Sequence, residues 1–212
     1  MLPPRAVSLI VMKFILAKKQ NMSQIFDEKG RAIPVTLVSA GPLTVTQIKT
    51  KENDGYEAVQ VGFGQRKEKN INKPQRTKGL FSCLREFRTP ASELKVGDKI
   101  DVGVFEEGDS VEVSGISKGK GFQGVVKRHG FAGGPRTHGQ KHSERKPGSI
   151  GSTGPQKVFK GTKMAGRMGA DRTTVKGLKI VKVDKENNRL YVFGAVPGRR
   201  GTLLEIKGQS RN

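Results

Sequence analysis

Hydrophobic and polar residues alternate in short runs along much of this chain. Alternation with a period of two is typical of β-strands with one buried face, and turns rich in Gly, Asn and Asp separate such strands. Turns of this kind occur at 96–98 and 185–188. The alternating or apolar runs are 33–48, 59–63, 100–104, 111–113, 178–183, 190–193 and 203–206. About seven or eight short antiparallel strands in roughly 150 residues predict a mainly β fold with a closed or nearly closed barrel.

The segment 73–88 breaks this pattern. Leu80, Phe81, Leu84 and Phe87 recur there at helix-like spacing, which favours a short helix. We predict one short helix or an irregular arm, the arm covering about 66–92. Cys83 lies in the same segment, and a single cysteine forms neither an internal disulfide nor a zinc site of several thiolates. We interpret it as a small buried apolar residue.

The basic residues are concentrated in one segment, 118–172. It contains 13 Lys and Arg and only two acids, Glu144 and Asp171, so it carries +11 of the chain's net charge of +21. It also holds 13 of the 28 glycines and all three histidines, whereas 12 of its 55 residues are apolar. So little apolar surface cannot offset the entropy of ordering the chain. We therefore predict a projection that becomes ordered on a partner.

This basic segment lies between two strand-rich regions, so it is an insertion into the barrel and not a tail. We predict a β-barrel domain of 13–117 and 173–209, with 118–172 as an extended loop whose ends are held together by the sheet. Residues 1–12 are interpreted as an extension or a misassigned start, with Met12 as the alternative first residue. Their apolar stretch is short and no small-residue cleavage site follows, so a secretory signal is not favoured.

The net charge of +21 indicates the class of partner. Copies of so basic a chain repel one another, so we expect a polyanionic partner and no homo-oligomer. Nucleic acid is the first candidate, because basic side chains gain affinity by releasing condensed counterions. A membrane partner would need a basic amphipathic helix or a spanning segment, and we find neither. RNA is favoured over DNA because no helix-turn-helix, zinc-finger or zipper pattern occurs, and because a glycine-rich irregular segment suits folded RNA.

The run Gly119–Gly124 matches the pattern G-x-G-x-x-G. In a dinucleotide-binding fold the third glycine begins a helix within a βαβ unit, and no helix of useful length fits after Gly124. We interpret these glycines as positions where the backbone packs closely against phosphate.

The histidines and carboxylates of the basic segment do not indicate an enzyme or a metal site. His138 and His142 stand four residues apart, but surrounding cations oppose Zn²⁺ binding, and histidines among arginines and glycines more often stack on bases or bind phosphate. Glu144 is flanked by cations and is expected to form an ion pair. No arrangement of acid, base and nucleophile is present, so we predict no catalytic residue, no metal ligand and no cofactor.

The candidate RNA-binding residues are the cations and histidines of the basic segment, with Phe122 as a contact to bases. An ordinary solvated charge run would contain more acids and fewer glycines, and would lack single Phe and Met residues that can wedge between RNA elements. The candidates are Lys118, Lys120, Phe122, Lys127, Arg128, His129, Arg136, His138, His142, Arg145, Lys146, Lys157, Lys160, Lys163, Arg167 and Arg172.

Several motifs of this segment occur in an order that resembles a known family. Ser117–Arg128 (SKGKGFQGVVKR), Thr137–Gly139, Pro147–Gly151 and Val158–Gly169 (VFKGTKMAGRMG) are similar to the bacterial type of the third large-subunit ribosomal protein family. Further matches lie outside the segment, at Asp54–Val61, Glu86–Arg88 and Gly194–Gly198. The resemblance runs from about Phe14 to Lys207.

This resemblance implies a structural constituent of the large ribosomal subunit in the cytoplasm, with a translation-factor-like barrel and an early role in assembly. It implies large-subunit rRNA as the partner, the fourteenth and nineteenth large-subunit proteins as neighbours, and no cofactor beyond structural Mg²⁺ ions of the rRNA. It also implies a loop that reaches toward the peptidyl transferase centre. The tip of that loop would comprise Ser149, Ile150, Gly151, Ser152, Thr153, Gly154 and Pro155.

The tip departs from the family pattern. Many bacterial members carry a methylated glutamine after the Pro-Gly-Ser-Ile-Gly run, whereas Ser152 follows that run here and Gln156 is out of register. Methylation at this site is therefore not predicted. A free RNA chaperone and an RNA-modifying enzyme are the alternatives for the function. The enzyme would need a nucleotide or methyl-donor site and catalytic acids, which the sequence does not provide.

Overall fold

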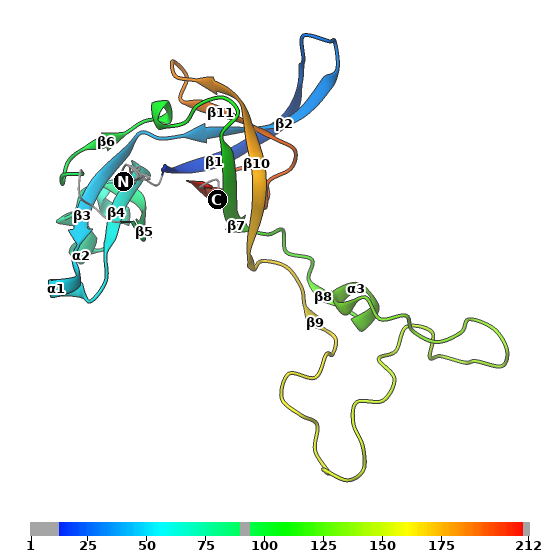
Figure 1. The fold of residues 1–212 in the computed structure, drawn as a ribbon. Helices are drawn as coiled ribbons and strands as arrows, with labels where there is room; N and C mark the ends of the chain where they lie inside the picture. The colour runs from blue at the N-terminus through cyan, green and yellow to red at the C-terminus, as the bar shows by residue number, and fades with distance from the viewer. Residues whose placement is uncertain (1–12, 90–93, 210–212) are drawn as a thin grey trace, which may run out of the picture. The chain divides into compact units, whose positions relative to one another are not determined.

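The computed structural model describes residues 13–89 and 94–209 (Figure 1). The interpretation of residues 1–12, including the choice between Met1 and Met12, falls outside these ranges, as does the end of the predicted arm. The chain divides into two compact units, one formed by the sequence up to Ile116 together with the sequence from Thr173, and one formed by Ser117–Arg172.

The first unit contains a closed antiparallel barrel, which confirms the predicted mainly β fold. Six strands close it in the order β1, β12, β7, β10, β11 and β2. Their bounds are β1 Phe14–Phe26, β2 Ala32–Ala40, β7 Ser110–Ile116, β10 Arg172–Asp184, β11 Arg189–Phe193 and β12 Leu203–Gly208. The alternation of the sequence fixes the inward face. Val111 and Val113 are fully buried on β7, and Leu204 and Ile206 are fully buried on β12.

A separate four-stranded sheet stands beside this barrel in the first unit, in the order β5, β4, β3 and β6. Its strands are β3 Leu43–Lys49, β4 Ala58–Gln65, β5 Phe81–Phe87 and β6 Lys99–Ile100. The Phe14 and Phe87 rings stack at 4.4 Å between centroids, and both side chains are buried. One hydrophobic core therefore joins barrel strand β1 to β5 of the second sheet. The sequence predicted the barrel but not this second sheet.

Of the short helix or irregular arm predicted for 73–88, the structure has a helix only at the start of the segment. A single helical turn, α2 (Lys73–Arg76), is followed by strand β5, which pairs with β4 from Phe81 opposite Gln65 to Phe87 opposite Val59. The apolar residues at helix-like spacing do not form one buried face, since the Leu80 side chain is 47% exposed. Cys83 and Phe87 instead face the hydrophobic core, whereas the Phe81 ring lies where a Cβ of Gly62 on β4 would stand. Pairing with β4 overrides the weak helical spacing.

The helices of the described residues are all short. They are α1 Lys51–Asp54, α2 Lys73–Arg76 and α3 Val125–His129, with 3₁₀ turns η1 at Glu68–Asn70 and η2 at Val102–Val104. The sequence predicted one short helix, so α1 and α3 were not anticipated. None of the helices in the described part of the chain is long and apolar enough to cross a membrane.

Cys83 is half-buried and packs at the margin of the core, so the expected full burial is not reached. Its Sγ lies 3.7 Å from the carbonyl oxygen of Phe63. Burial raises the pKa of the Cys83 thiol, although the nearby charge of Arg85 opposes this effect.

Candidate nucleic-acid-binding loop

The second unit, Ser117–Arg172, begins and ends as a two-stranded stem, which we define as residues 117–124 and 164–172. In it, β8 (Phe122–Gln123) pairs antiparallel with β9 (Gly166–Arg167). The Lys120 N–H donates to the Met168 carbonyl at 2.9 Å, and the Met168 N–H donates to the Gly121 carbonyl at 3.0 Å. Backbone hydrogen bonds therefore hold the two legs of the loop together at its base.

Helix α3 (Val125–His129) links the two legs through side chains. Arg128 Nη1 donates to the carbonyl oxygen of Met164 at 2.7 Å, and His129 Nε2 lies 3.0 Å from the same oxygen. Because a carbonyl oxygen can only accept, this contact requires a proton on His129 Nε2. Arg128 and His129 are half-buried, so these two predicted RNA contacts also stabilise the loop itself.

The G-x-G-x-x-G run does lead into a helix, but α3 has only five residues. The preceding strand β8 has an antiparallel partner, β9, which is not the parallel βαβ arrangement of a dinucleotide fold. The interpretation that these glycines let the backbone pack closely against phosphate stays a prediction. Within the stem, close approach is required at Gly169, whose φ is +77° and where an added Cβ would overlap the carbonyl oxygen of Lys118.

Beyond α3 the chain forms an irregular lobe, residues 131–150, which we call the distal lobe. The Gly134 N–H donates to the Glu144 carbonyl at 3.0 Å and closes the lobe. Glu144 forms the expected ion pair, at 3.2 Å, but its partner is Arg136 and not an adjacent cation. The Arg136 side chain is 82% exposed in this pair, so solvent screening leaves it little stabilising effect.

The remaining predicted cations and histidines are exposed on the second unit, where a polyanion could reach them. The exposed candidates are Lys118, Lys120, Lys127, Arg136, His138, His142, Arg145, Lys146, Lys157, Lys160, Lys163, Arg167 and Arg172. Lys141 is exposed as well and was missing from the sequence-based set. His138 and His142 adopt left-handed backbone conformations, with φ of +59° and +58°. No group of three or more His, Cys, Asp or Glu side chains suited to a metal ion occurs among the residues that the structure describes.

Large apolar side chains are exposed among these cations. Phe122 is 77% exposed and Phe159 is 61% exposed, and Ile150, Val158 and Met164 are also exposed. In a segment with so few apolar residues, exposed aromatic rings beside cations are typical of surfaces that stack on nucleobases. Of the predicted tip residues, Ser149 to Gly154 are exposed and Pro155 is partly buried. The Ser149 hydroxyl donates to the Gly151 carbonyl at 3.0 Å.

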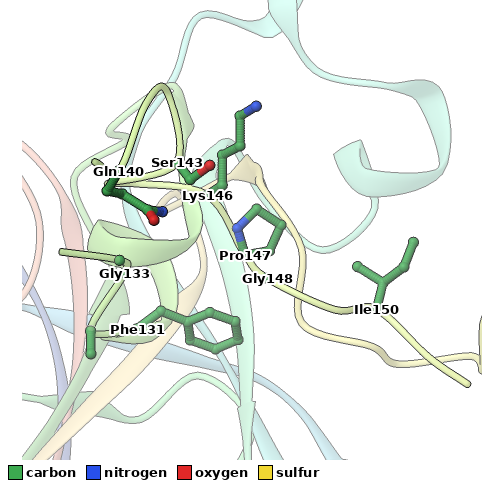
Figure 2. Close-up of a pocket in the computed structure, with 10 residues that line it drawn as sticks. Phe131, Gly133, Gln140, Ser143, Lys146, Pro147, Gly148 and Ile150 are labelled. Atoms are coloured by element: carbon green, nitrogen blue, oxygen red, sulfur yellow. The ribbon is translucent and has the colours of Figure 1, made fainter. Parts of the chain in front are cut away.

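The distal lobe also contains an open pocket of about 790 Å³ (Figure 2). Phe131, Pro147 and Ile150 supply its apolar surface, Gln140 and Ser143 supply polar groups, and Lys146 lies at its edge. Of these six residues only Lys146 and Ile150 belong to the sequence-based site. Phe131 is one of the single Phe residues of the basic segment that were expected to wedge between RNA elements. The pocket is formed by residues up to 19 positions apart, so only the folded lobe brings them together.

An exposed and strongly basic segment with single exposed aromatic rings is typical of nucleic-acid-binding proteins. Comparison with known proteins identifies the family. Residues 65–195 match the family model described as ribosomal protein L3. The chain is 52% identical over 204 residues to the large ribosomal subunit protein uL3 of Carboxydothermus hydrogenoformans, covering 92% of this chain and 96% of that protein. It is also 52% identical over 201 residues to the uL3 of Synechococcus sp., covering 91% and 92%, respectively.

This chain therefore belongs to the ribosomal protein L3 family. The family consists of structural ribosome components and not of enzymes, which confirms the prediction of a non-catalytic protein.

Proposed function

We propose that this protein is a structural component of the large ribosomal subunit, located with it in the cytoplasm, and that it binds large-subunit rRNA mainly through residues 117–172. The observation that carries the proposal is the combination of charge and exposure in this unit. Its net charge of +11 in residues 118–172 is displayed on exposed side chains, with exposed Phe122 and Phe159 among them. The family relationship supports the ribosomal role.

The mechanism is electrostatic neutralisation combined with ordering on the RNA. Each lysine or arginine that meets a phosphate releases condensed counterions, which favours binding most strongly at low salt. The stem needs little further ordering, because its legs are already bonded at Lys120 and Met168. The exposed chain between the distal lobe and the stem, residues 151–163, would gain most of its order from the RNA.

The family resemblance supports further details of this function. They are an early role in subunit assembly, a tip at 149–155 that points toward the peptidyl transferase centre, and the fourteenth and nineteenth large-subunit proteins as neighbours. We expect no cofactor of the protein's own, and any Mg²⁺ at the interface would belong to the rRNA. The site residues named above would contact phosphate, ribose or bases within this framework.

Co-sedimentation with large subunits in high salt tests this function. The full chain should remain bound at one copy per subunit, because a ribosomal constituent is held by a defined site as well as by charge. A variant without residues 136–160 should keep the thermal unfolding transition of the barrel and bind rRNA more weakly. Release of the full chain by salt, or binding of many copies per subunit, would instead favour a free RNA chaperone.

A further inference from the structure

The pocket of the distal lobe differs from the exposed cations around it, because its walls are fixed by the backbone. At Gly133 (φ +77°) an added Cβ would overlap the carbonyl oxygen of Glu144. At Gly134 an added Cβ would lie 2.9 Å from Nε2 of Gln140. The absence of side chains at these two positions lets the two sides of the lobe meet and brings the Gln140 carboxamide against the backbone. The pocket is therefore shaped before any ligand is bound.

The chemistry of the pocket is that of a nucleobase site. Figure 2 shows the Phe131 ring and the Gln140 carboxamide turned toward the space beside Pro147, whereas the Lys146 side chain extends away from it. An aromatic ring provides a stacking surface, and a carboxamide can both donate to and accept from the edge of a base. Lys146 is exposed beside the pocket, where it could bind the phosphate of the same nucleotide. The volume of about 790 Å³ is within the range of small-ligand sites.

Gln140 is available for this role. Within the described part of the chain, its side chain forms no hydrogen bond, so both its donor and its acceptor can serve a ligand. The acid nearest in sequence to the pocket lining, Glu144, is paired with Arg136 and does not line the pocket. A pocket without a carboxylate in a segment of net charge +11 favours an anionic ligand over a neutral one, and the Phe131 ring and the Gln140 carboxamide favour a nucleotide over an acidic peptide.

We infer that this pocket binds one unpaired nucleobase of the RNA, stacked on Phe131 and hydrogen-bonded by Gln140. The inference rests on the proposed function, since it specifies the partner of the same loop as single-stranded RNA with an unstacked base. Base-paired RNA could still bind the surrounding cations, but its bases would be unable to enter.

The test compares rRNA binding by the full chain and by substitutions at Phe131, at fixed salt and over a salt series. Phe131→Leu keeps an apolar side chain in the lobe and removes the aromatic face, so binding should weaken between about 5- and 150-fold, the range expected for one stacked base. The log–log salt slope should stay unchanged, because no charge is removed. Phe131→Trp should bind at least as tightly as the wild type. Phe193→Leu, at an exposed phenylalanine of the barrel, is the matched control and should have no effect.

Fluorescence gives a second readout, because the chain contains no tryptophan and Phe131→Trp is therefore a unique probe. A single-stranded oligouridine should quench this tryptophan, whereas an RNA duplex of the same length should bind without quenching it. Wild-type affinity for Phe131→Leu, or equal quenching by single-stranded and duplex RNA, would overturn the nucleobase pocket and leave rRNA binding intact. Failure of the wild-type chain to bind rRNA would overturn both the pocket and the proposed function.

Discussion

Gly133 packs directly against the carbonyl oxygen of Glu144, so that a Cβ at residue 133 would overlap this oxygen. The same oxygen accepts the hydrogen bond of the Gly134 N–H at 3.0 Å. The distal lobe is therefore closed by contacts of the main chain, and the ion pair between Arg136 and Glu144 is exposed and secondary. A single methyl group at residue 133 should be enough to open it.

Gly133→Ala should disrupt the distal lobe, and Gly139→Ala is its matched control. Both glycines have a φ of +77°, so each alanine carries the left-handed strain of about 1–2 kcal/mol. Only Gly133 also faces a backbone atom, whereas nothing lies within 4 Å of a Cβ at Gly139. Amide exchange of the Gly134 N–H should accelerate in the first variant and change little in the second. Equal acceleration in both would show that strain, and not the contact with Glu144, governs the lobe.

Phe87→Ala should destabilise the first unit by about 3–5 kcal/mol, because it leaves a cavity beside Phe14 in a well-packed core. The Phe87 side chain is 1% exposed and stacks on Phe14 at 4.4 Å. Chemical denaturation measures the loss of stability. Phe26→Ala, at a side chain that is 64% exposed, should change the free energy of unfolding by no more than about 0.5 kcal/mol. A small effect at Phe87 would contradict a core shared by the barrel and the second sheet.

Glu86 should make the stability of the first unit depend on acid pH. Burial raises the pKa of Glu86, but hydrogen bonds from Tyr56, Lys49 and Gln60 outweigh this effect and hold it below its ordinary value of about 4.5. A carboxyl with a lowered pKa in the folded state contributes stability above the unfolded pKa, and this contribution disappears as the pH falls through the folded pKa.

Glu86→Gln should therefore flatten the acid limb of the stability curve, measured by urea denaturation from pH 6 downward. The hydroxyl of Tyr56 donates to Glu86 at 2.8 Å, so the variant should also be less stable near neutral pH. Glu28→Gln, in the exposed turn after β1, is the control and should leave the acid limb unchanged. An unaltered acid limb in Glu86→Gln would rule out this network as a source of the pH dependence.

Amide exchange of the free protein should distinguish the stem from the rest of the loop. The N–H groups of Lys120 and Met168 are bonded across the stem and should exchange slowly. The N–H groups of 149–154, on exposed chain without a strand partner, should exchange rapidly and become protected when rRNA is added. Strong protection throughout 118–172 without RNA would contradict ordering on the partner.

The strands of the barrel could be predicted because their alternation has a clear period and turns that contain Gly, Asn or Asp separate them. The runs at 111–113, 190–193 and 203–206 became β7, β11 and β12. The division of the strands between a barrel and a second sheet could not be predicted, because alternation indicates which face is buried and not which strand is the partner. For the same reason β5 was not predicted as a strand, and its segment was interpreted as a short helix or an irregular arm, since its pairing with β4 is a long-range property.

The cations of the loop could be identified from charge alone, since solvated cations need no particular tertiary contact to be exposed. The pocket of the distal lobe could not be identified from the sequence. Phe131 and Gln140 line the same space in an irregular lobe whose chain passes through left-handed conformations at Gly133, His138 and Gly139, and histidine adopts this conformation infrequently. The double role of Arg128, which stabilises the loop through Met164, also depends on a contact between residues 36 positions apart.

The most direct test of rRNA binding by residues 117–172 is the salt dependence of the affinity for large-subunit rRNA. One variant replaces the six Lys and Arg of 136–160 by Gln, at Arg136, Lys141, Arg145, Lys146, Lys157 and Lys160. A matched barrel variant replaces six exposed cations, at Lys29, Arg31, Lys182, Lys185, Arg199 and Arg200. The loop variant should reduce the log–log slope by about 0.7–0.9 for each phosphate that is no longer neutralised, and by more than the barrel variant does. An equal reduction in both variants, or an unchanged slope in the loop variant, would contradict the assignment of rRNA binding to this loop.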